Sequence, residues 1–503
     1  MQRRTFLTWC AFASSSSALQ CYGVDIIKDT QLNNPQHNGD IYVKWFGTDA
    51  NAIQKANDLA FRSKSSVIFE DIDYIIDKPI RISTIWRGIP RKTRIIISER
   101  FSFQKSFDPL SYSAITNTNL ETYYNPLTAN YIELNGIDFI HRANENSAKE
   151  TLALANIKGG KISNCCFFTE TDSSSVVTPI DIFACVKNFI IENTKVVNNT
   201  KARAGGAIWI RNITKNGSNP ENSTENIVIK NSSFSTSSVD EAIAIYGVFG
   251  MVKNIQILNS FISSEPSPVK HGTLASTFPL GKSPFAGVEN ILWDTCTFKS
   301  DNFQNHILRI GESSDSDNRC HNIRVNNCTF IADSITSNIS YIARNIPCNG
   351  ANIEFTKNKI YADTSRKPIS CGISGFHLAT NNTLSGKIEQ GFSNCETVSY
   401  NVTKSFTGTA AFNCQNVHNN NFSVKKNGIV CNQTMICNIH DNKIQVETSG
   451  ERSFGVIINS IRGSNPYATI TGNKITLKNK NSDAIFVHSN LRKIIHSSNS
   501  IMK

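Results

Sequence analysis

A short motif recurs along this chain of 503 residues, and it restricts the fold more than any other feature. Each copy holds an alternating apolar stretch, a bend that often contains Asn, and then Phe, Val or Ile. Such alternation is typical of a β-strand, and Asn tolerates the left-handed backbone of tight bends. Copies roughly 22–38 residues apart predict a solenoid of stacked coils. The clear copies are GKISNCCFF (160–168), NFIIENTKV (188–196), NIVIKNSSF (226–234), NIQILNSFI (254–262), NILWDTCTF (290–298), NIRVNNCTF (322–330) and NIEFTKNKI (352–360).

Weaker copies and a second strand type fill the rest of the chain. Together they predict two or three strands per coil and about a dozen coils. A β-propeller would need regular blades of about 40–45 residues with their own signatures, and these are absent. The weaker copies are NVHNNNF (416–422), NIHDNKI (438–444), ATITGNKI (468–475) and KIIHSSNSI (493–501). The second strand type comprises GAIWIRN (206–212), EAIAIYG (241–247), HILRIGE (306–312), FGVIINS (454–460) and DAIFVHS (483–489).

Two positions of each bend are expected to stack from coil to coil. The first should form a ladder of side-chain amide hydrogen bonds between Asn164, Asn193, Asn231, Asn259 and Asn327. The second stacks Cys165, Thr194, Ser232, Ser260, Cys296 and Cys328. Cysteine at a repeated bend position predicts a small buried side chain rather than a metal ligand or nucleophile. The chain has 14 Cys, and export would permit disulfides whose pairing the sequence does not give.

The N-terminus has the layout of an export signal. Arg3 and Arg4 precede Thr5, Phe6 and Leu7, which resembles the twin-arginine signal of bacteria. We therefore expect a periplasmic or secreted protein. The predicted organisation is an export signal at 1–21, a cap with the first strands at 22–129, and the repeat at 130–503.

Composition and charge narrow the ligand class. No apolar run of about 18 residues is present, so no membrane span is predicted. The formal charge is +11, with one short basic cluster at Arg87, Arg91, Lys92 and Arg94. No nucleic-acid-binding motif accompanies this charge. An acidic polysaccharide is therefore a better expected partner than nucleic acid.

The segment that precedes the repeat carries a family resemblance. Residues 47–60 predict a short helix that Asp49 or Thr48 caps, with Ile53, Ala56, Leu59 and Ala60 on one face. Two β runs follow at 67–69 and 74–76. This segment resembles the N-terminal cap of the pectate-lyase-like right-handed parallel β-helix superfamily, although Glu70 and Ile72 replace its usual Pro and Gly. The matching residues are Asp49, Asn51, Ile53, Ala56, Val67, Phe69 and Tyr74.

The resemblance implies an all-β fold: a single-stranded right-handed parallel β-helix of about a dozen coils with a short N-terminal capping helix. It also implies a polysaccharide ligand in a groove along one side. On the second strand type, Trp209 and Arg309 should face outward in one row, and Arg211 and Tyr246 in the next. Aromatic rings, arginines and carboxyls together suit stacking, charge pairing and proton transfer. The predicted catalytic residues are Asp240, Glu241, His306 and Arg309. The predicted substrate-binding residues are Trp209, Arg211, Tyr246, Lys270 and His271.

Motifs of related enzymes are incomplete in this chain. The hydrolase set of the superfamily is missing apart from Asp240-Glu241, and these neighbours would point to opposite faces of a strand unless a bend intervenes. The order of segments around Lys270 and Arg309 is similar to the core of pectate lyases. However, Gln304 stands in place of their upstream Arg, and Ala244 replaces a second calcium-site Asp. No metal ligand and no cofactor are therefore predicted, and calcium is disfavoured.

Three functions follow from these expectations. The first is an enzyme of the lyase, hydrolase or epimerase type acting on an acidic glycan. The second is a non-catalytic binding or assembly protein, because the leader and repeat are similar in layout to the β-helix protein of colanic acid exopolysaccharide production. The third is a phage tailspike-like depolymerase, which the export signal disfavours. The sequence leaves open whether the protein is a monomer or a trimer.

Overall fold

The computed structural model divides into the units Met1–Gln31 and Leu32–Lys503, and the fold below is that of the second unit. The structure describes residues 39–102, 113–117, 129–143, 148–171, 177–200, 205–213, 223–264, 271–280, 285–300, 303–311, 319–332, 340–346, 352–362, 367–406, 408–432, 437–447, 452–459, 467–478, 482–488 and 493–502. The expected export signal lies outside these ranges.

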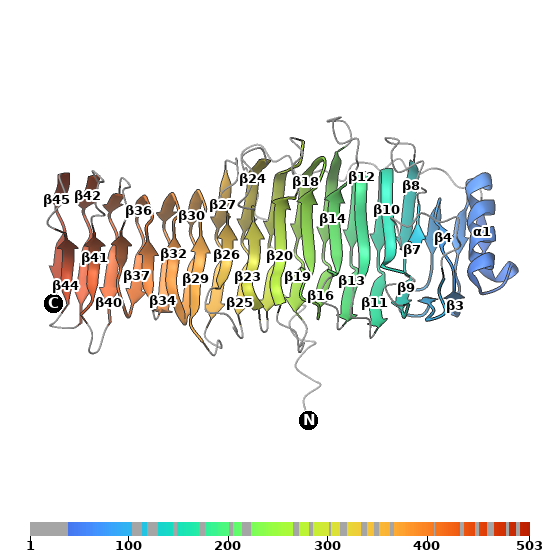
Figure 1. Ribbon diagram of the computed structural model, residues 1–503, viewed down its shortest axis with the longest axis horizontal. Coiled ribbons are helices and arrows are strands. Elements are labelled where there is room, and N and C mark those ends of the chain that lie inside the picture. Colours follow the sequence, from blue (N-terminus) through green and yellow to red (C-terminus); the bar gives the residue numbers. More distant parts are fainter. Residues whose placement is uncertain are drawn as a thin grey trace, which may run out of the picture. The chain divides into compact units, whose positions relative to one another are not determined.

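The described residues of this unit form a right-handed parallel β-helix in which equivalent strands of successive coils pair side by side (Figure 1). A complete coil passes through three rows, which we call row 1, row 2 and row 3 in chain order. Rows 1 and 2 belong to one 30-stranded sheet because β10 and β12 run through both, and row 3 is a separate 16-stranded sheet.

The strand bounds are as follows. Row 1 holds β4 (Ile80–Arg81), β7 (Ser113–Thr116), β10 (Glu150–Ser163), β12 (Thr178–Glu192), β14 (Ile208–Asn212), β17 (Ile243–Gly247), β20 (His271–Pro279), β23 (Phe303–Ile310), β26 (Tyr341–Asn345), β29 (Ile369–Ser374), β32 (Ile388–Ser393), β35 (Thr409–Phe412), β38 (Ile429–Cys431), β41 (Phe454–Ile458) and β44 (Asp483–Val487). Row 2 holds β1 (Asp40–Tyr42), β2 (Ser66–Ile68), β5 (Ile85–Arg87), β8 (Ala129–Asn135), β15 (Thr224–Lys230), β18 (Met251–Leu258), β21 (Gly287–Asp294), β24 (Arg319–Asn326), β27 (Ile353–Thr356), β30 (Leu378–Thr380), β33 (Thr397–Ser399), β36 (Asn416–His418), β39 (Cys437–His440), β42 (Tyr467–Thr471) and β45 (Lys493–Ser497). Row 3 holds β3 (Asp73–Ile76), β6 (Arg94–Ile97), β9 (Asp138–His141), β11 (Cys166–Thr171), β13 (Lys195–Thr200), β16 (Ser233–Thr236), β19 (Phe261–Ser264), β22 (Thr297–Ser300), β25 (Thr329–Ala332), β28 (Lys359–Ala362), β31 (Thr383–Gly386), β34 (Val402–Phe406), β37 (Asn421–Val424), β40 (Lys443–Val446), β43 (Lys474–Leu477) and β46 (Ser500–Met502).

The number of coils exceeds the expected dozen. Row 3 alone has sixteen strands within the described residues. The additional coils lie in the C-terminal half, where equivalent positions such as Asn382, Asn401 and Asn420 are only 19 residues apart. These short coils lack the longer apolar stretch of the motif, so the repeat is compressed there. Parallel stacking also extends into the 22–129 segment, where β2 pairs with β5 and β3 with β6.

A helix covers the apolar end of the first coil. Helix α1 (Ala50–Ser63) follows the short 3-10 turn η1 (Val43–Trp45) and packs beside β1, β2 and β4. Asp49 caps it as predicted, because its side chain accepts a hydrogen bond of 2.8 Å from the backbone N–H of Ala52. Ile53, Ala56 and Ala60 are buried on the inner face. Leu59, which was predicted on the same face, is 37% exposed.

The bends use left-handed Asn residues, but the expected ladder is only partly formed. Asn259 donates to Asn231 at 2.8 Å, whereas no hydrogen bond joins the side chain of Asn193 to either neighbouring coil in the described part of the chain. Asn164 donates instead to Asn135, and Asn327 to the hydroxyl of Thr295. Except for the half-buried Asn164, these side chains are exposed at a corner, where water can satisfy their polar groups.

Continuous ladders form at two other positions. An outer ladder of bonds of 3.0–3.1 Å joins Asn188, Asn226, Asn254, Asn290, Asn322 and Asn352. An inner ladder continues the position of Cys328 and joins Asn358, Asn382, Asn401, Asn420, Asn442, Asn473 and Asn499. Each inner carbonyl oxygen accepts a backbone N–H of the preceding coil. Burial makes these bonds obligatory, because an unpaired amide in the core is costly.

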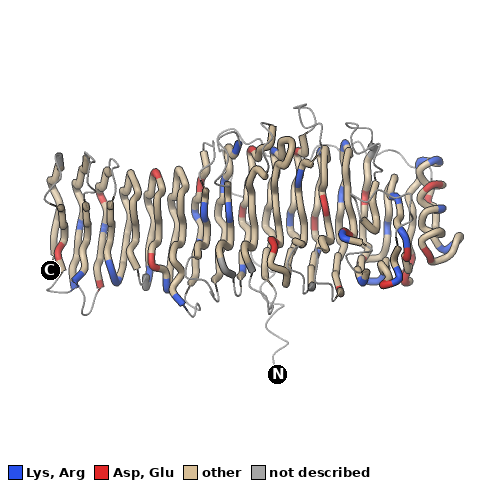
Figure 2. The backbone as a smooth tube through the Cα atoms, viewed as in Figure 1, with Lys and Arg blue, Asp and Glu red and all other residues tan. Residues whose placement is uncertain are grey.

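Cysteines and charges take the expected structural positions. Cys165, Cys296 and Cys328 are buried free thiols, which confirms their prediction as small core residues. Basic and acidic residues are interspersed along the coils (Figure 2). In the basic cluster, Arg91, Lys92 and Arg94 each form an ion pair with an Asp. No helix among the described residues is long and apolar enough to cross a membrane.

Candidate functional site

The outer face of row 1 gathers most of the predicted site residues. Trp209 pairs with Ala244, which pairs with Ser276, which in turn pairs with Arg309. The inward neighbours of these positions, such as Ile208 and Ile243, belong to the apolar core. Trp209 and Arg309 therefore lie in one outward row, as the alternation predicts. Arg211 and Tyr246 pair in the next row.

Two carboxyls lie where the chain enters β17. Asp240 and Glu241 are in a bend rather than in the strand, so strict alternation does not apply to them. One carboxyl oxygen of Asp240 accepts a hydrogen bond of 2.9 Å from the backbone N–H of Gly205. Glu241 lies beside Ser276 and within the electrostatic reach of Arg309. The bend thus brings a carboxyl to the arginine of a strand two coils away.

Glu241 is suited to hold a proton near neutral pH. Burial, followed by the negative charge of Asp240, raises the pKa of Glu241 to about 7, although Ser276 and Arg309 favour the ionised form. A carboxylic acid with a pKa near the working pH can donate a proton in one step and accept it in another. Strongly shifted carboxyls of this kind are frequent at functional sites.

His306 lies on the same face and is held neutral. Its side chain is only 9% exposed, and its ring stacks on that of Tyr341 with the centroids 5.6 Å apart. Burial, followed by the positive charges of Arg344 and Arg309, lowers the pKa of His306 to about 3. Neither ring nitrogen has a hydrogen-bond partner among the described residues. A buried imidazole without partners is expensive unless something else binds there.

A second ionic cluster lies toward the N-terminal end of the face. The guanidinium of Arg211 makes a two-point contact with the fully buried Asp181, with 3.0 Å between Nε and Oδ1. Glu150 is nearby, and burial together with the charge of Asp181 raises its pKa to about 7. Arg211 also lies over the rings of Trp209 and Phe183, at 4.6 and 4.8 Å from their centroids. The cluster fixes Arg211 and Trp209 in place.

Aromatic rings connect the two clusters. The ring centroids of Trp209 and Tyr246 are 6.5 Å apart, and those of Tyr246 and Phe278 are 5.6 Å apart. The guanidinium of Arg309 lies 4.8 Å from the centroid of Phe278. The indole N–H of Trp209 is buried and has no partner among the described residues. The face therefore offers stacking surfaces and an unused hydrogen-bond donor side by side.

The structure adds members that the sequence reasoning missed. Asp181 and Glu150 lie in β12 and β10, which are two long apolar strands without the second-strand motif that guided the prediction. An acidic residue inside an apolar run was the signal available in the sequence. Ser276, Phe278, Tyr341 and Arg344 also belong to the face, and only their strand register places them there.

The structure does not test two of the predicted residues. Lys270 lies outside the described residues, and for His271 only the backbone pairing with Phe303 at the start of β20 is described. The described residues contain no group of three or more His, Cys, Asp or Glu side chains that could hold a metal ion.

Comparison with known proteins gives likeness of fold only. No protein-family model and no curated protein matches the chain. PfbA, a surface adhesin of Streptococcus pneumoniae, has 12% sequence identity and a TM-score of 0.46 over 90% of this chain and 93% of that chain. A tailspike protein of E. coli bacteriophage HK620, solved with a pentasaccharide, has 11% identity and a TM-score of 0.43 over 87% and 74%. An alginate lyase from Paenibacillus has 10% identity and a TM-score of 0.35 over 68% and 99%. Similarity this low assigns no activity.

Proposed function

We propose that this chain is an exported β-helix enzyme that acts on an acidic polysaccharide at the outer face of row 1, by removing and returning protons. The observation that carries the proposal is that Glu241 and His306 both lie within the electrostatic reach of Arg309 on one face. Glu241 has a pKa near 7, and His306 is buried with both ring nitrogens unpartnered in the described part of the chain. The reaction class is that of a lyase or an epimerase of uronic acid residues.

The proposed chemistry begins with recognition of a sugar carboxylate. Arg309 and Arg344 pair with each other in register and supply positive charge beside His306. A carboxylate bound there would make the adjacent C5 proton of the sugar more acidic, because the arginines stabilise the developing negative charge. The bound carboxylate would also offset the two positive charges that lower the pKa of His306. Substrate binding would therefore make the imidazole a stronger base.

In the proposed reaction, one side chain of the face removes a proton from the sugar and another supplies a proton to it. His306 takes the C5 proton, and Glu241 in its protonated form gives a proton to the glycosidic oxygen at C4. The C4–O bond breaks and a C4–C5 double bond forms, so that one fragment begins with an unsaturated sugar and the other, which keeps the protonated oxygen, gains a new reducing end. Epimerisation follows instead if a proton returns to C5 on the opposite side. Either route needs one acid and one base on this face.

Hydrolysis is the alternative enzymatic route. It requires two carboxyls that flank the bond, at about 5–5.5 Å or about 6.5–9.5 Å from each other. Asp240 and Glu241 share one bend, whereas Asp181 is tied to Arg211. Glu150 belongs to the same cluster as Asp181 and Arg211, and the other members of the face are basic, aromatic or small, such as Ser276. Elimination or epimerisation therefore fits these side chains better than hydrolysis does.

A non-catalytic function is the second candidate, and one observation favours it. Several polar or aromatic members of the face, including Asp181, Ser276 and Tyr246, are buried. Buried side chains cannot contact a glycan, so the half-exposed Trp209 and Arg309 would supply the contacts. A protein that only binds exopolysaccharide during export or assembly would need no more than these contacts and would not cleave or modify the glycan. A tailspike-like depolymerase is the third candidate, and it would be a trimer.

Turnover assays on the full-length protein separate these functions. Polygalacturonate and alginate would be incubated with it, in calcium and in chelator, while unsaturated products, reducing ends and NMR-detected epimers are followed. We expect turnover that falls at least about 100-fold in Arg309→Ala and Glu241→Ala. Arg452→Ala is a matched control, because Arg452 lies just before the row-1 strand β41 and its guanidinium lies over the aromatic ring of Phe454, near the C-terminal end of the stack. If turnover fell as much in Arg452→Ala as in Arg309→Ala and Glu241→Ala, the outer face of row 1 would not be the active site.

Binding without turnover would overturn the enzymatic proposal and support the non-catalytic one. Light scattering of the same preparation addresses the third candidate, since a trimer favours the tailspike-like function and a monomer removes it.

A further inference from the structure

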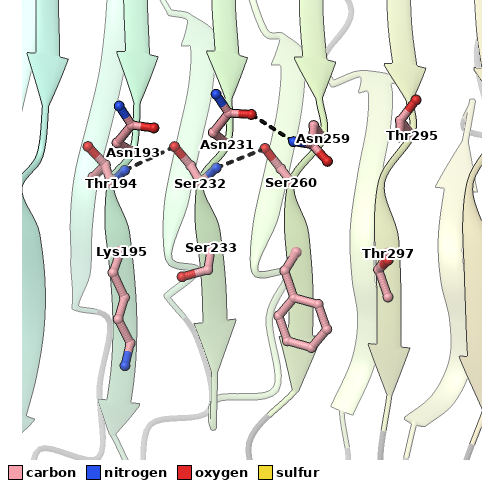
Figure 3. Close-up of a pocket in the computed structure, with 11 residues that line it drawn as sticks. Asn193, Thr194, Lys195, Asn231, Ser232, Ser233, Asn259, Ser260, Thr295 and Thr297 are labelled. Carbon is pink, nitrogen blue, oxygen red and sulfur yellow. Dashed lines mark hydrogen bonds between the residues drawn. The ribbon is translucent and has the colours of Figure 1, made fainter. Parts of the chain in front are cut away.

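A shallow groove follows the corner between row 2 and row 3, and row 1 takes no part in it. It has a volume of about 530 Å³ and crosses four successive coils. Figure 3 shows its polar side chains repeating from coil to coil. The lining residues are Asn193, Thr194, Lys195, Asn231, Ser232, Ser233, Asn259, Ser260, Phe261, Thr295 and Thr297.

Part of the polar lining is already committed to the fold. The hydroxyls of Ser232 and Ser260 accept backbone N–H groups of the preceding coils and donate to carbonyls of their own coils. Asn259 donates one hydrogen bond to the amide oxygen of Asn231 (Figure 3). These contacts hold the bends at a fixed spacing and leave other polar groups unused.

The interrupted amide ladder leaves hydrogen-bonding groups open to solvent. The exposed side chain of Asn193 makes no hydrogen bond to any described residue, and the NH₂ group of Asn231 donates to none of them. In the complete outer ladder at Asn188, Asn226 and Asn254, by contrast, each amide binds the next. The groove thus presents amide donors and acceptors at the spacing of the coils, about 4.8 Å.

An exposed aromatic ring lies in the same groove. Phe261 is 42% exposed, and its partners in the neighbouring coils are the small residues Ser233 and Thr297. The small neighbours leave both sides of the ring accessible. The exposed Lys195 provides a positive charge at the N-terminal side of the ring. An aromatic ring between amides, hydroxyls and one cation offers both apolar and polar contacts.

We propose that this groove is a second polysaccharide-binding site, which holds a glycan chain along the stacking axis independently of row 1. A sugar ring has an apolar face that can stack on Phe261 and hydroxyls that can bond with Asn193 and Asn231. The repeat of an extended glycan, roughly 5 Å per residue, is close to the coil spacing. Lys195 would favour an acidic residue at that end. This inference adds a second glycan-binding site to the proposed function, and glycan binding there does not require that row 1 be catalytic.

The test uses the full-length protein with row 1 disabled by Arg309→Ala. Its retardation in gels that contain polygalacturonate or alginate measures binding, with neutral dextran as the comparison glycan. We expect the Arg309→Ala protein to retain binding to at least one acidic glycan. Adding Phe261→Ala should weaken that binding about fivefold or more, through the lost stacking. Ser233→Trp, which fills the groove beside the ring, should have the same effect.

Tyr361→Ala is the matched control, because Tyr361 is a 41%-exposed aromatic residue of row 3 outside the groove. Thermal unfolding would confirm that each variant is folded. Unchanged binding in both groove variants, equal weakening in the control, or no binding once Arg309 is removed would each overturn the second site. Absence of turnover in the natural protein, with intact binding in the groove, would contradict the proposed enzyme alone.

Discussion

At the scale of residues, two buried glutamates of row 1 and its entrance have strongly raised pKa values. Burial and a neighbouring Asp raise the pKa of both Glu150 and Glu241 to about 7. Sequence reasoning found Glu241 because it precedes an outward-facing strand. It missed Glu150 because burial among apolar neighbours is a property of the coil stack and not of the local sequence. The roles of these residues are proposals that variants can test.

The raised pKa values predict that the fold is more stable in mild acid. A carboxyl whose pKa rises from 4.5 to about 7 contributes stability below pH 4.5 and loses it as the pH rises through 7. For Glu150 the loss is on the order of 3 kcal/mol. Glu150→Gln should therefore unfold at a higher temperature than the natural protein at pH 8, with a much smaller difference at pH 5. Glu447→Gln is the control, because Lys478 and other partners lower the pKa of that exposed glutamate. If Glu150→Gln raised the unfolding temperature by the same amount at pH 5 and pH 8, the raised pKa of Glu150 would be contradicted.

A charge variant tests the state of His306. Arg344 contributes to the lowered pKa of His306, after burial and ahead of Arg309. Arg344→Gln should therefore raise the pKa of His306 above about 3, as measured by NMR titration of the imidazole. Arg452→Gln, in a distant coil, should leave it unchanged. An unaltered imidazole titration in Arg344→Gln would show that the two side chains do not interact.

At the scale of elements, the bend positions have different functions in different coils. The sequence motif correctly predicts left-handed Asn residues, because few other residues adopt that backbone without strain. It does not predict which Asn side chains pair, since pairing depends on whether a bend position faces the core or the solvent. Likewise, the short coils near Asn401 lack the strong apolar run, so their number was underestimated.

The inner Asn ladder predicts a large stability effect at a single position. The amide oxygen of Asn401 accepts both the backbone N–H and the side-chain NH₂ of Asn382, and its own NH₂ donates to Ala379 and Asn420. Asn401→Ala would leave several buried groups unpaired, at a cost of about 2–4 kcal/mol. Denaturant unfolding measures this free energy. Asn419→Gly, at an adjacent exposed bend where glycine keeps the positive φ, should cost much less. Equal costs would mean that the inner ladder contributes little.

At the scale of the whole molecule, stacking gives the β-helix two sides that can serve a long ligand. Coils from β12 to β23 carry the ionic and aromatic face on row 1, and the same stretch of coils carries the amide groove between rows 2 and 3. The fold was predictable from the repeat, because each coil restates the same pattern. Strand alignment also predicted that Glu241, His306 and Arg309 share one face, and Glu241 and His306 each interact electrostatically with Arg309. The groove between rows 2 and 3 was not predictable from the sequence, because it arises where the amide ladder at Asn193 and Asn231 is interrupted.

The central claim is that row 1 moves the C5 proton of an acidic sugar, and one measurement tests it most directly. Polygalacturonate and alginate would be incubated with the full-length protein in D₂O, and the glycans would be analysed by NMR. The account predicts deuterium at C5 or unsaturated ends, both abolished in Glu241→Gln and Arg309→Ala and retained in Arg452→Ala. Absence of both signals with the natural protein, or their persistence in the two row-1 variants, would contradict it.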